Sequence, residues 1–305
     1  MKNISVLIFS IFICCNRSDF RKQIDMNWKI VNTEIDSDLL LYEGYNLGVP
    51  LRAWTVIISN KKLYSISILV SSDEDGLDTP GNIALDKDAI VVINGGYFTR
   101  GAIPVHHVGL LKSENILIEP ASNTVIRDNI RYNINRGAFG IFENGDIDIG
   151  WSSTRNDSIF IWDSPIGNRP GKPADLNYEN AKFWNVKEAI HAGPVLISNG
   201  RINVTTEEEV FFNTPVDGVQ PRSAIGYKKN GDIVIMVVDG RQVASRGAYL
   251  KELAMLMLQF NCHKALNLDG GGSSALIVEG DLINRPIGLN SQREVMSSIG
   301  IISNN

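Results

Sequence analysis

The sequence predicts an α+β fold of mixed or antiparallel β-sheets with few helices and a cleft at the strand ends. Short apolar runs rich in Val and Ile recur along the chain, as expected of strands. The segments 139–149 and 224–238 each place an Asn-Gly turn between two such runs, which is typical of hairpins. Only the segment at about 247–260 has the three- and four-residue apolar spacing of an amphipathic helix.

The N-terminus has the pattern of an export signal. Lys2 precedes roughly ten apolar residues that end at Cys14 and Cys15, a run too short to span a bilayer. The pattern is similar to a bacterial lipoprotein signal in which Cys15 would be lipidated; ordinary secretion is the alternative. We therefore expect residues 1–15 to be a signal peptide and residues 16–27 a polar tether, on an exported cell-envelope lipoprotein that is periplasmic or surface-facing.

The remaining elements are predicted from local patterns. Residues 53–58 and 63–70 predict a hairpin around the turn 59–62. The continuous apolar run 89–93 is typical of a strand buried on both faces. The segment 156–185 is rich in Pro, Gly and Trp, and we expect a long surface loop there.

Composition indicates that residues 28–305 form one globular domain or two closely packed lobes. The chain of 305 residues is 44% hydrophobic and 21% charged, enough for a sizeable core. Its net charge of −5 argues against a nucleic-acid partner and leaves the predicted lipid anchor as the expected membrane contact. Only Cys262 of the three cysteines falls in this domain, so we expect no disulfide there.

Polar residues next to glycine stand at the ends of several predicted strands. Glycine at such positions lets a ligand approach main-chain N–H groups closely. One polar strand end means little, but several together predict a single cleft rimmed by strand termini. The residues at these ends are Asn94, Gly95, Gly96, His191, Arg222, Asp239, Arg241, Asn267, Asp269, Gly270, Gly271 and Gly272.

These motifs resemble the phosphodiester glycosidase family, which includes the mammalian enzyme that uncovers mannose 6-phosphate and bacterial domains of unknown function. The resemblance covers about residues 50–302. It is carried mainly by residues 267–274, with Asp-Gly-Arg about thirty residues earlier and Glu252 on the helix between them. Residues 245–248 fit the family pattern loosely, and His106-His107 has no counterpart in it.

The resemblance implies hydrolysis of the glycosidic C–O bond of a sugar-1-phosphodiester similar to an N-acetylglucosamine-1-phosphodiester, releasing free sugar and a phosphomonoester. Asp269 and Glu252 are then the expected acid/base pair, with Asp239 as a third carboxylate. Because the second pKa of phosphate is about 6, protonating this leaving group gains little, and cations and N–H donors matter more. The expected substrate contacts are Arg222, Arg241 and Arg293 for phosphate, and Asn94, Gly95, Gly96, His191, Asn267, Gly270, Gly271, Gly272, Ser273 and Ser274 for the sugar or its loop.

Other interpretations stay open. A sugar-binding lipoprotein without catalysis would use aromatic side chains for stacking, and a phosphodiesterase would cut the P–O bond instead of the C–O bond. No cofactor is expected with certainty, although Asp239, Asp269 and Asn94 offer the oxygen ligands that calcium or magnesium takes. Structural roles are the alternatives for single residues, such as a buried imidazole for His191. The aromatic residues considered for stacking are Tyr97, Trp151, Trp162 and Trp184.

Overall fold

The computed structural model describes residues 24–31, 38–59 and 63–304. The predicted signal peptide and residues 16–23 of the predicted tether lie outside the described residues. Ile24 and Met26, at the end of the predicted tether, are buried in the same apolar cluster as the residues of the longer helix. None of the helices in the described ranges combines the length and the apolar character needed to cross a bilayer.

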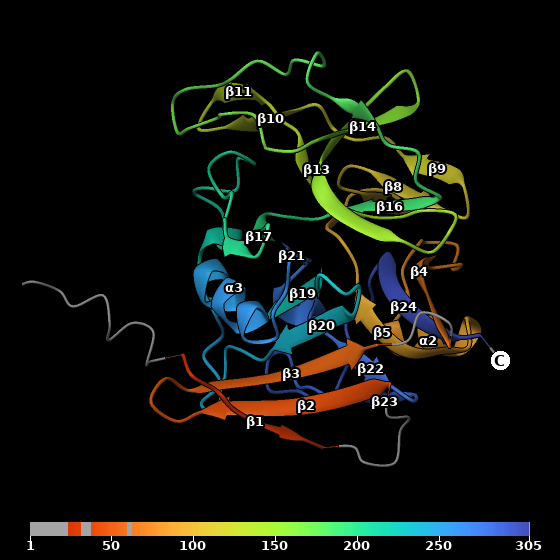
Figure 1. The fold of residues 1–305 in the computed structure, drawn as a ribbon, viewed down its shortest axis with the longest axis vertical. Helices are drawn as coiled ribbons and strands as arrows, with labels where there is room; N and C mark the ends of the chain where they lie inside the picture. Colours follow the sequence, from red (N-terminus) through yellow and green to blue (C-terminus); the bar gives the residue numbers. More distant parts are fainter. Residues whose placement is uncertain (1–23, 32–37, 60–62, 305) are drawn as a thin grey trace, which may run out of the picture.

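The largest sheet has eight strands joined by antiparallel pairing, and α3 (Leu250–Gln259) packs against it (Figure 1). The apolar side of α3 covers one face of this sheet, and the other face turns toward the centre of the molecule. The strands in order across the sheet are β1 (Asn27–Ile30), β2 (Leu39–Asn46), β3 (Leu51–Ile58), β20 (Ile233–Val238), β19 (Arg222–Tyr227), β21 (Lys264–Asn267), β17 (Val195–Ser198) and β18 (Arg201–Ile202).

The second sheet has seven strands and lies at the top of Figure 1. Its centre is the hairpin predicted from the Asn-Gly turn, and its edge strands are short. The strands in order are β15 (Lys182–Phe183), β14 (Ser158–Trp162), β13 (Ile147–Arg155), β12 (Arg136–Ile141), β16 (Glu188–His191), β8 (Leu111–Ser113) and β9 (Ile116–Glu119).

The third sheet has five strands, and α2 (Pro80–Asp86) packs on it. Two small ribbons and two single-turn helices complete the described fold. The five strands in order are β23 (Asp281–Leu282), β22 (Leu276–Val278), β5 (Ala89–Asn94), β24 (Ser297–Ser303) and β4 (Tyr64–Val70). The remaining elements are β6 (Phe98–Thr99), β7 (His106–His107), β10 (Thr124–Arg127), β11 (Ile130–Asn133), η1 (Pro215–Asp217) and η2 (Gly271–Ser273).

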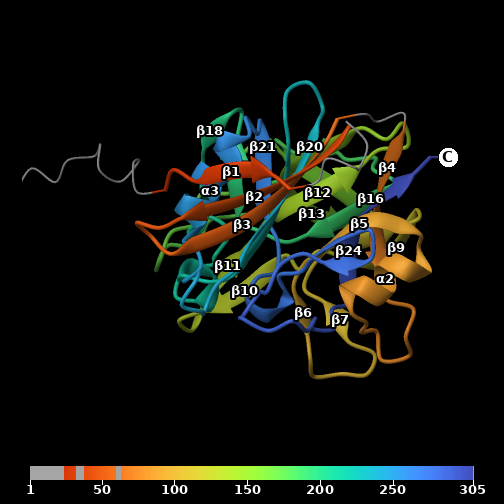
Figure 2. The same cartoon turned by 90° about the horizontal axis from the view of Figure 1, so that it is seen from below.

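One hydrophobic core joins the three large sheets. Val56 of β3, Ile93 of β5 and Phe139 of β12 are all buried in the same cluster. Figure 2 shows the same arrangement from below, with the 5-stranded sheet and α2 beside the larger sheets. Because each sheet buries a face against the other two, the sheets stabilise one another.

The strand register brings the predicted polar strand ends to one edge. Arg222 pairs with Val238, and Ala224 pairs with Asn267, so these ends of β19, β20 and β21 lie side by side. Asn94 ends β5, and a main-chain hydrogen bond from Asp269 N to Gly95 O (3.0 Å) joins that end to the glycine loop. The predicted α+β class, with antiparallel sheets, few helices and a cleft at the strand ends, is confirmed.

Both predicted Asn-Gly hairpins are confirmed, whereas the hairpin of residues 53–58 and 63–70 is wrong. β3 has β2 on one edge and β20 on the other, so no edge is free for β4. β4 instead pairs with β24, far along the chain. Sequence proximity favoured the wrong partner because both runs have strand-like composition.

Two other element predictions need correction. The expected loop 156–185 contains β14, whose Ile159 and Ile161 are buried, and β15. α3 begins at Leu250, later than the expected 247, because Gly247 has φ +98 and packs against the main chain of Gln220. α2 was not predicted, since seven residues are too few to show helical periodicity.

Candidate active site

The glycine loop after β21 is shaped by close approaches to neighbouring main chain. Gly271 has φ +63, and its N–H donates to Pro221 O at 3.0 Å. A Cβ on Gly270 would lie 2.8 Å from Pro221 O, which is too close for any side chain. Glycine is therefore required here for both conformation and space. Gly270 N–H also donates to Asp269 Oδ1 at 2.9 Å, so the loop orients the carboxylate that precedes it.

Asn94 ties the loop to two other strands. Its Nδ2 donates to Asp269 O at 2.7 Å, and its Oδ1 accepts from Ser223 Oγ at 2.6 Å and from Ala275 N at 3.2 Å. The side chain is fully buried, and its amide is occupied on both sides. Asn94 therefore positions Asp269, and the structure does not bring it to a surface that a sugar could reach.

A cavity of about 180 Å³ lies over the loop and collects much of the predicted site. Asp269 is the only carboxylate among the described residues that line it. The predicted Arg222, Arg241 and Arg293 reach the same cavity from three different segments. The segment of η1 also contributes, and no sequence motif pointed to it. The full lining is Tyr97, Pro215, Val216, Gln220, Arg222, Arg241, Asp269, Gly270, Gly271, Gly272 and Arg293.

Asp269 is held between opposing electrostatic influences. Burial raises the pKa of its carboxyl, whereas the Ser273 hydroxyl, the Gly270 N–H and the charges of Arg293 and Arg100 lower that pKa. A carboxyl with this balance can exchange a proton in a cleft partly shielded from water. Arg100 comes from the β6–β7 connection, which the sequence motifs did not single out.

Arg222 is a buried cation held by main-chain carbonyls. Its side chain is 2% exposed, and its guanidinium donates to Ala248 O and Val216 O at 2.9 Å each and to Gly218 O. Burial lowers the pKa of Arg222 to about 10, so the group keeps its charge at neutral pH. Carbonyl dipoles orient this cation without neutralising it.

The three arginines that line the cavity have no carboxylate partner within ion-pair distance among the described residues. Arg241, at φ 56, donates through Nε and Nη2 to Gln220 Oε1, and Arg293 Nη1 donates to Ser273 Oγ at 3.4 Å. One carboxylate therefore faces three guanidinium groups. The cavity has a surplus of positive charge that suits an anionic ligand.

Tyr97 completes the wall of the cavity. Its hydroxyl donates to Gly193 O at 2.8 Å and accepts from Asn267 Nδ2 at 3.0 Å. Burial, and next the charge of Asp269, raises the pKa of the phenol, which therefore stays protonated. Asn267 is buried and also donates to Gly193 O, so its role is to fix Tyr97.

Glu252 and Asp239 do not line the cavity. Glu252 is buried at the start of α3, where Oε1 accepts from Arg246 Nη2 at 2.6 Å and Oε2 accepts from Tyr249 N at 2.9 Å. It thus caps the first turn of α3 through the main-chain N–H of Tyr249. Asp239 Oδ1 accepts from Asn284 Nδ2 and Arg285 N at 3.0 Å each, and burial raises the pKa of its carboxyl.

The other predicted contacts do not line the cavity. His191 is buried, its Nε2 lies 2.8 Å from Ser152 Oγ, and burial lowers its pKa to about 3. A Cβ on Gly96 would lie 2.2 Å from His191 O, so Gly96 is a packing requirement. Ser273 hydrogen-bonds Asp269, and Ser274 is buried with its carbonyl accepting from Asn284. Gly95 is buried and accepts from Asp269 N.

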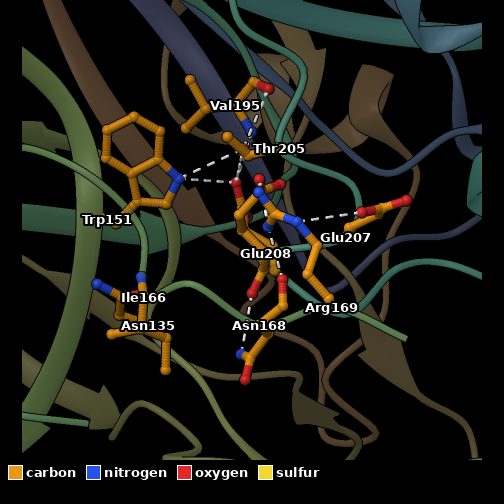
Figure 3. A network of polar contacts seen from close by, with 10 residues as sticks. Asn135, Trp151, Ile166, Asn168, Arg169, Val195, Thr205, Glu207 and Glu208 are labelled. Atoms are coloured by element: carbon orange, nitrogen blue, oxygen red, sulfur yellow. Dashed lines mark hydrogen bonds and ion pairs between the residues drawn. The ribbon is translucent and has the colours of Figure 1, made fainter. Parts of the chain in front are cut away.

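Another buried carboxylate, that of Glu209, which sequence reasoning missed, supports the site from within the core. Glu209 accepts from Trp151 Nε1 at 2.9 Å, Thr205 Oγ1 at 2.5 Å, Val195 N at 2.8 Å and Gly137 N at 2.8 Å. Figure 3 shows Trp151, Thr205 and Val195 converging on this network. The carboxylate also lies against Gly193, whose carbonyl accepts from Tyr97. No pattern of spacing could have revealed these partners.

Two further observations concern the alternatives left open above. Within the described ranges, no group of three or more His, Cys, Asp or Glu side chains is arranged so that it could hold a metal ion. Trp151, Trp162 and Trp184 are buried, so these three rings cannot stack on a sugar. Tyr97 is the one aromatic residue of that set in the cavity wall.

The model of the phosphodiester glycosidase family matches residues 87–302 of the chain. The bovine N-acetylglucosamine-1-phosphodiester alpha-N-acetylglucosaminidase is 36% identical over 100 residues, covering 30% of this chain and 19% of that protein. An uncharacterised SPbeta-prophage-derived protein of Bacillus subtilis (strain 168) is 47% identical over 64 residues, covering 21% of this chain and 10% of that protein. The alignments thus span about a fifth or less of these relatives' lengths.

Solved structures share the fold. The zebrafish N-acetylglucosamine-1-phosphodiester alpha-N-acetylglucosaminidase catalytic domain, auto-inhibited by its pro-peptide, matches with a TM-score of 0.59 and 20% identity. That match covers 91% of this chain and 83% of the zebrafish chain. A hypothetical protein from Synechocystis matches with a TM-score of 0.60 and 19% identity over 88% of this chain and 62% of its own.

Proposed function

This chain belongs to the phosphodiester glycosidase family, and from that premise we propose that it hydrolyses the glycosidic C–O bond of a sugar-1-phosphodiester. An N-acetylglucosamine-1-phosphodiester is the proposed substrate type, and the products are the free sugar and a phosphomonoester. The observation that carries this proposal is the cavity in which one carboxylate, Asp269, faces three arginines without carboxylate partners. A neutral sugar alone gives no reason for that charge surplus, whereas a phosphodiester does.

The arginines are proposed to hold the phosphate. Arg222 offers a charge that is fixed in place by three carbonyls, and Arg241 and Arg293 approach from the rim. When the C–O bond breaks, negative charge grows on the bridging oxygen. Fixed cations around that oxygen stabilise the transition state more than the ground state. They replace the acid that most glycosidases use to protonate the leaving oxygen.

Asp269 is proposed to act on the water molecule. The water oxygen forms a bond to the anomeric carbon while the bond from that carbon to the bridging oxygen breaks, and the electron pair stays on the phosphate. The water proton passes to Asp269 and then to the phosphomonoester or to solvent, which restores the carboxylate. Burial that raises the pKa of Asp269 makes it a better proton acceptor than an exposed aspartate. Glu252, both of whose oxygens accept from protein donors, and Asp239, whose Oδ1 accepts two hydrogen bonds, do not line the cavity and are left in positioning roles.

The test is hydrolysis of methyl N-acetylglucosamine-1-phosphate by the full chain in ¹⁸O-labelled water. We expect free sugar carrying the label, with kcat falling by about a hundredfold or more in Asp269→Asn, as for loss of a general base. Asp163→Asn, at an exposed residue that follows β14 and does not line the cavity, is the control. Label in the phosphate would identify a phosphodiesterase instead. Sugar binding without turnover would favour the non-catalytic alternative, which the buried tryptophans make less suitable.

We also propose that the chain is an exported cell-envelope lipoprotein anchored through Cys15, on the N-terminal pattern alone. Fractionation of producing cells tests it: the parent should sediment with membranes, and Cys15→Ser should shift to the soluble fraction. Recovery of the parent in the soluble fraction, with Cys15→Ser unchanged in location, would count against the anchor and favour simple secretion.

A further inference from the structure

Several exposed aliphatic side chains gather on turns beside the cavity. Val243 is 99% exposed, Leu289 54% and Ile287 38%. Leu47, on the β2–β3 turn, is 86% exposed. We call Leu47, Val243, Ile287 and Leu289 the apolar lip. Single exposed aliphatic residues are common, but several on adjoining turns indicate a binding surface.

Main-chain contacts hold these turns together. Gly240 N donates to Pro286 O at 2.9 Å, and Gln242 Nε2 donates to Arg285 O at 2.6 Å, which joins the turn of Val243 to the turn of Ile287. Arg246 N donates to Pro50 O at 2.9 Å, which joins the turn of Leu47. The lip is therefore built on three connected turns with a defined relative position.

Two turns of the lip are continuous along the chain with the cavity wall. Arg241, in the cavity wall, is two residues before Val243, and Arg293, also in the wall, follows Leu289 along the same segment. A group that leaves the cavity beside these arginines would therefore pass close to the turns of Val243 and Leu289. Arg246, unlike the three arginines of the cavity, forms an ion pair with Glu252, so its charge is already compensated within the protein.

The size of the cavity decides which part of the substrate reaches the lip. Its volume of about 180 Å³ is below the range of roughly 300–1,000 Å³ for pockets that enclose a whole drug-sized ligand. With sugar and phosphate inside, the group esterified to the far side of the phosphate must lie outside, and the turns of Val243 and Leu289 are the apolar surface next to Arg241 and Arg293 along the chain. Aliphatic side chains favour an aliphatic group there.

Resting on the function proposed above, we propose that the leaving group is an amphiphilic phosphate, a phosphomonoester of a long-chain alcohol whose alkyl chain lies on the apolar lip. The arginines bind the phosphate, and the lip removes part of the chain from water. The site would then select sugar-phospholipid-like substrates over sugar phosphates attached to hydrophilic groups.

The experiment compares methyl and octyl esters of N-acetylglucosamine-1-phosphate, kept below the micelle concentration of the octyl ester, with the full chain. We expect a KM about tenfold or more lower for the octyl ester and a similar kcat, because contact with a few methylene groups is uniform binding far from the reacting carbon. In the double variant Val243→Gln/Leu289→Gln the ratio of the two KM values should fall to about one. Glutamine adds no charge, so the field on the phosphate is kept.

Ile116→Gln is the matched control, since Ile116 is 64% exposed on β9 of another sheet, and it should retain the chain-length preference. Equal KM values for both esters in the parent, or a preference that persists in the double variant, would overturn the proposal. If neither ester is hydrolysed, the proposed function fails, and calorimetry with octyl phosphate against methyl phosphate still decides the role of the lip. If the parent binds octyl phosphate more tightly than methyl phosphate and the double variant does not, the proposed role of the lip is supported. Equal binding of the two phosphates by the parent would contradict that role.

Discussion

Two buried ionic groups in this molecule, Glu209 and Arg222, differ in how their charge is compensated by the surrounding protein. Glu209 has its carboxylate surrounded by four hydrogen-bond donors from β12, β13, β17 and Thr205. Arg222 keeps a full charge that main-chain carbonyls orient, and among the described residues no carboxylate forms an ion pair with it. A buried ionic group whose hydrogen bonds are all made within the protein stabilises the fold. A buried charge without an ion-pair partner can instead bind a ligand of opposite charge. This contrast separates scaffold from site more clearly than burial does.

The largest expected effect on stability is that of substituting Glu209, whose carboxylate has four hydrogen-bond donors. Glu209→Gln keeps the volume but turns one acceptor oxygen into a donor among four donors. We expect the free energy of unfolding to fall by about 3 kcal/mol, the cost of breaking a buried charged network. Urea unfolding followed by circular dichroism measures it. Glu207→Gln, at a half-exposed ion pair with Arg169, should change stability by less than about 0.5 kcal/mol. Equal losses of stability in Glu209→Gln and Glu207→Gln would contradict the structural role given to Glu209.

Substitution of Arg222, which has no ion-pair partner, should lower activity more than stability. Arg222→Lys removes the planar guanidinium, in which Nε and Nη2 donate to main-chain carbonyls while Nη1 is left for a phosphate oxygen. We expect kcat/KM for the methyl ester to fall by about a hundredfold, or about 2.7 kcal/mol of transition-state stabilisation. The stability loss should be smaller, about 1 kcal/mol, from weaker carbonyl contacts. Arg131→Lys, at an exposed arginine of β11, is the control. A variant that unfolds readily yet retains activity would assign Arg222 to the scaffold.

The smallest expected effect is that of Arg293, at the rim of the cavity, and it is seen in the pH dependence of kcat/KM. Arg293 lowers the pKa of Asp269, so Arg293→Met should raise that pKa. Because the proposed base works ionised, the acid limb of the kcat/KM profile should move to higher pH, with only a few-fold loss at neutral pH for an exposed charge. The same profile for Arg285→Met, whose charge is not among those acting on Asp269, should not move. A limb that moved to lower pH in Arg293→Met would contradict the base role.

The sequence was sufficient for the parts of the site that follow strands. Asp269, the glycines and three arginines stand in local patterns, and antiparallel register then brings them to one edge. Glu252 shows the limit: its position on a helix is visible in the sequence, but its engagement by Arg246 is not. Glu209 and the η1 segment were missed because their partners are distant in sequence. The same limit explains β4, whose true partner β24 lies at the other end of the domain.

The pairing of β24 with β4 and β5 also sets an order of events during synthesis. β24 lies between these two early strands, so the 5-stranded sheet cannot close until residue 303 has left the ribosome. β5 carries Asn94, which fixes the loop of Asp269, so a nascent chain has no assembled site. Contacts this distant in sequence also slow folding. The 5-stranded sheet and the loop that Asn94 fixes can therefore assemble only after β24 has been synthesised, so the site forms late in folding.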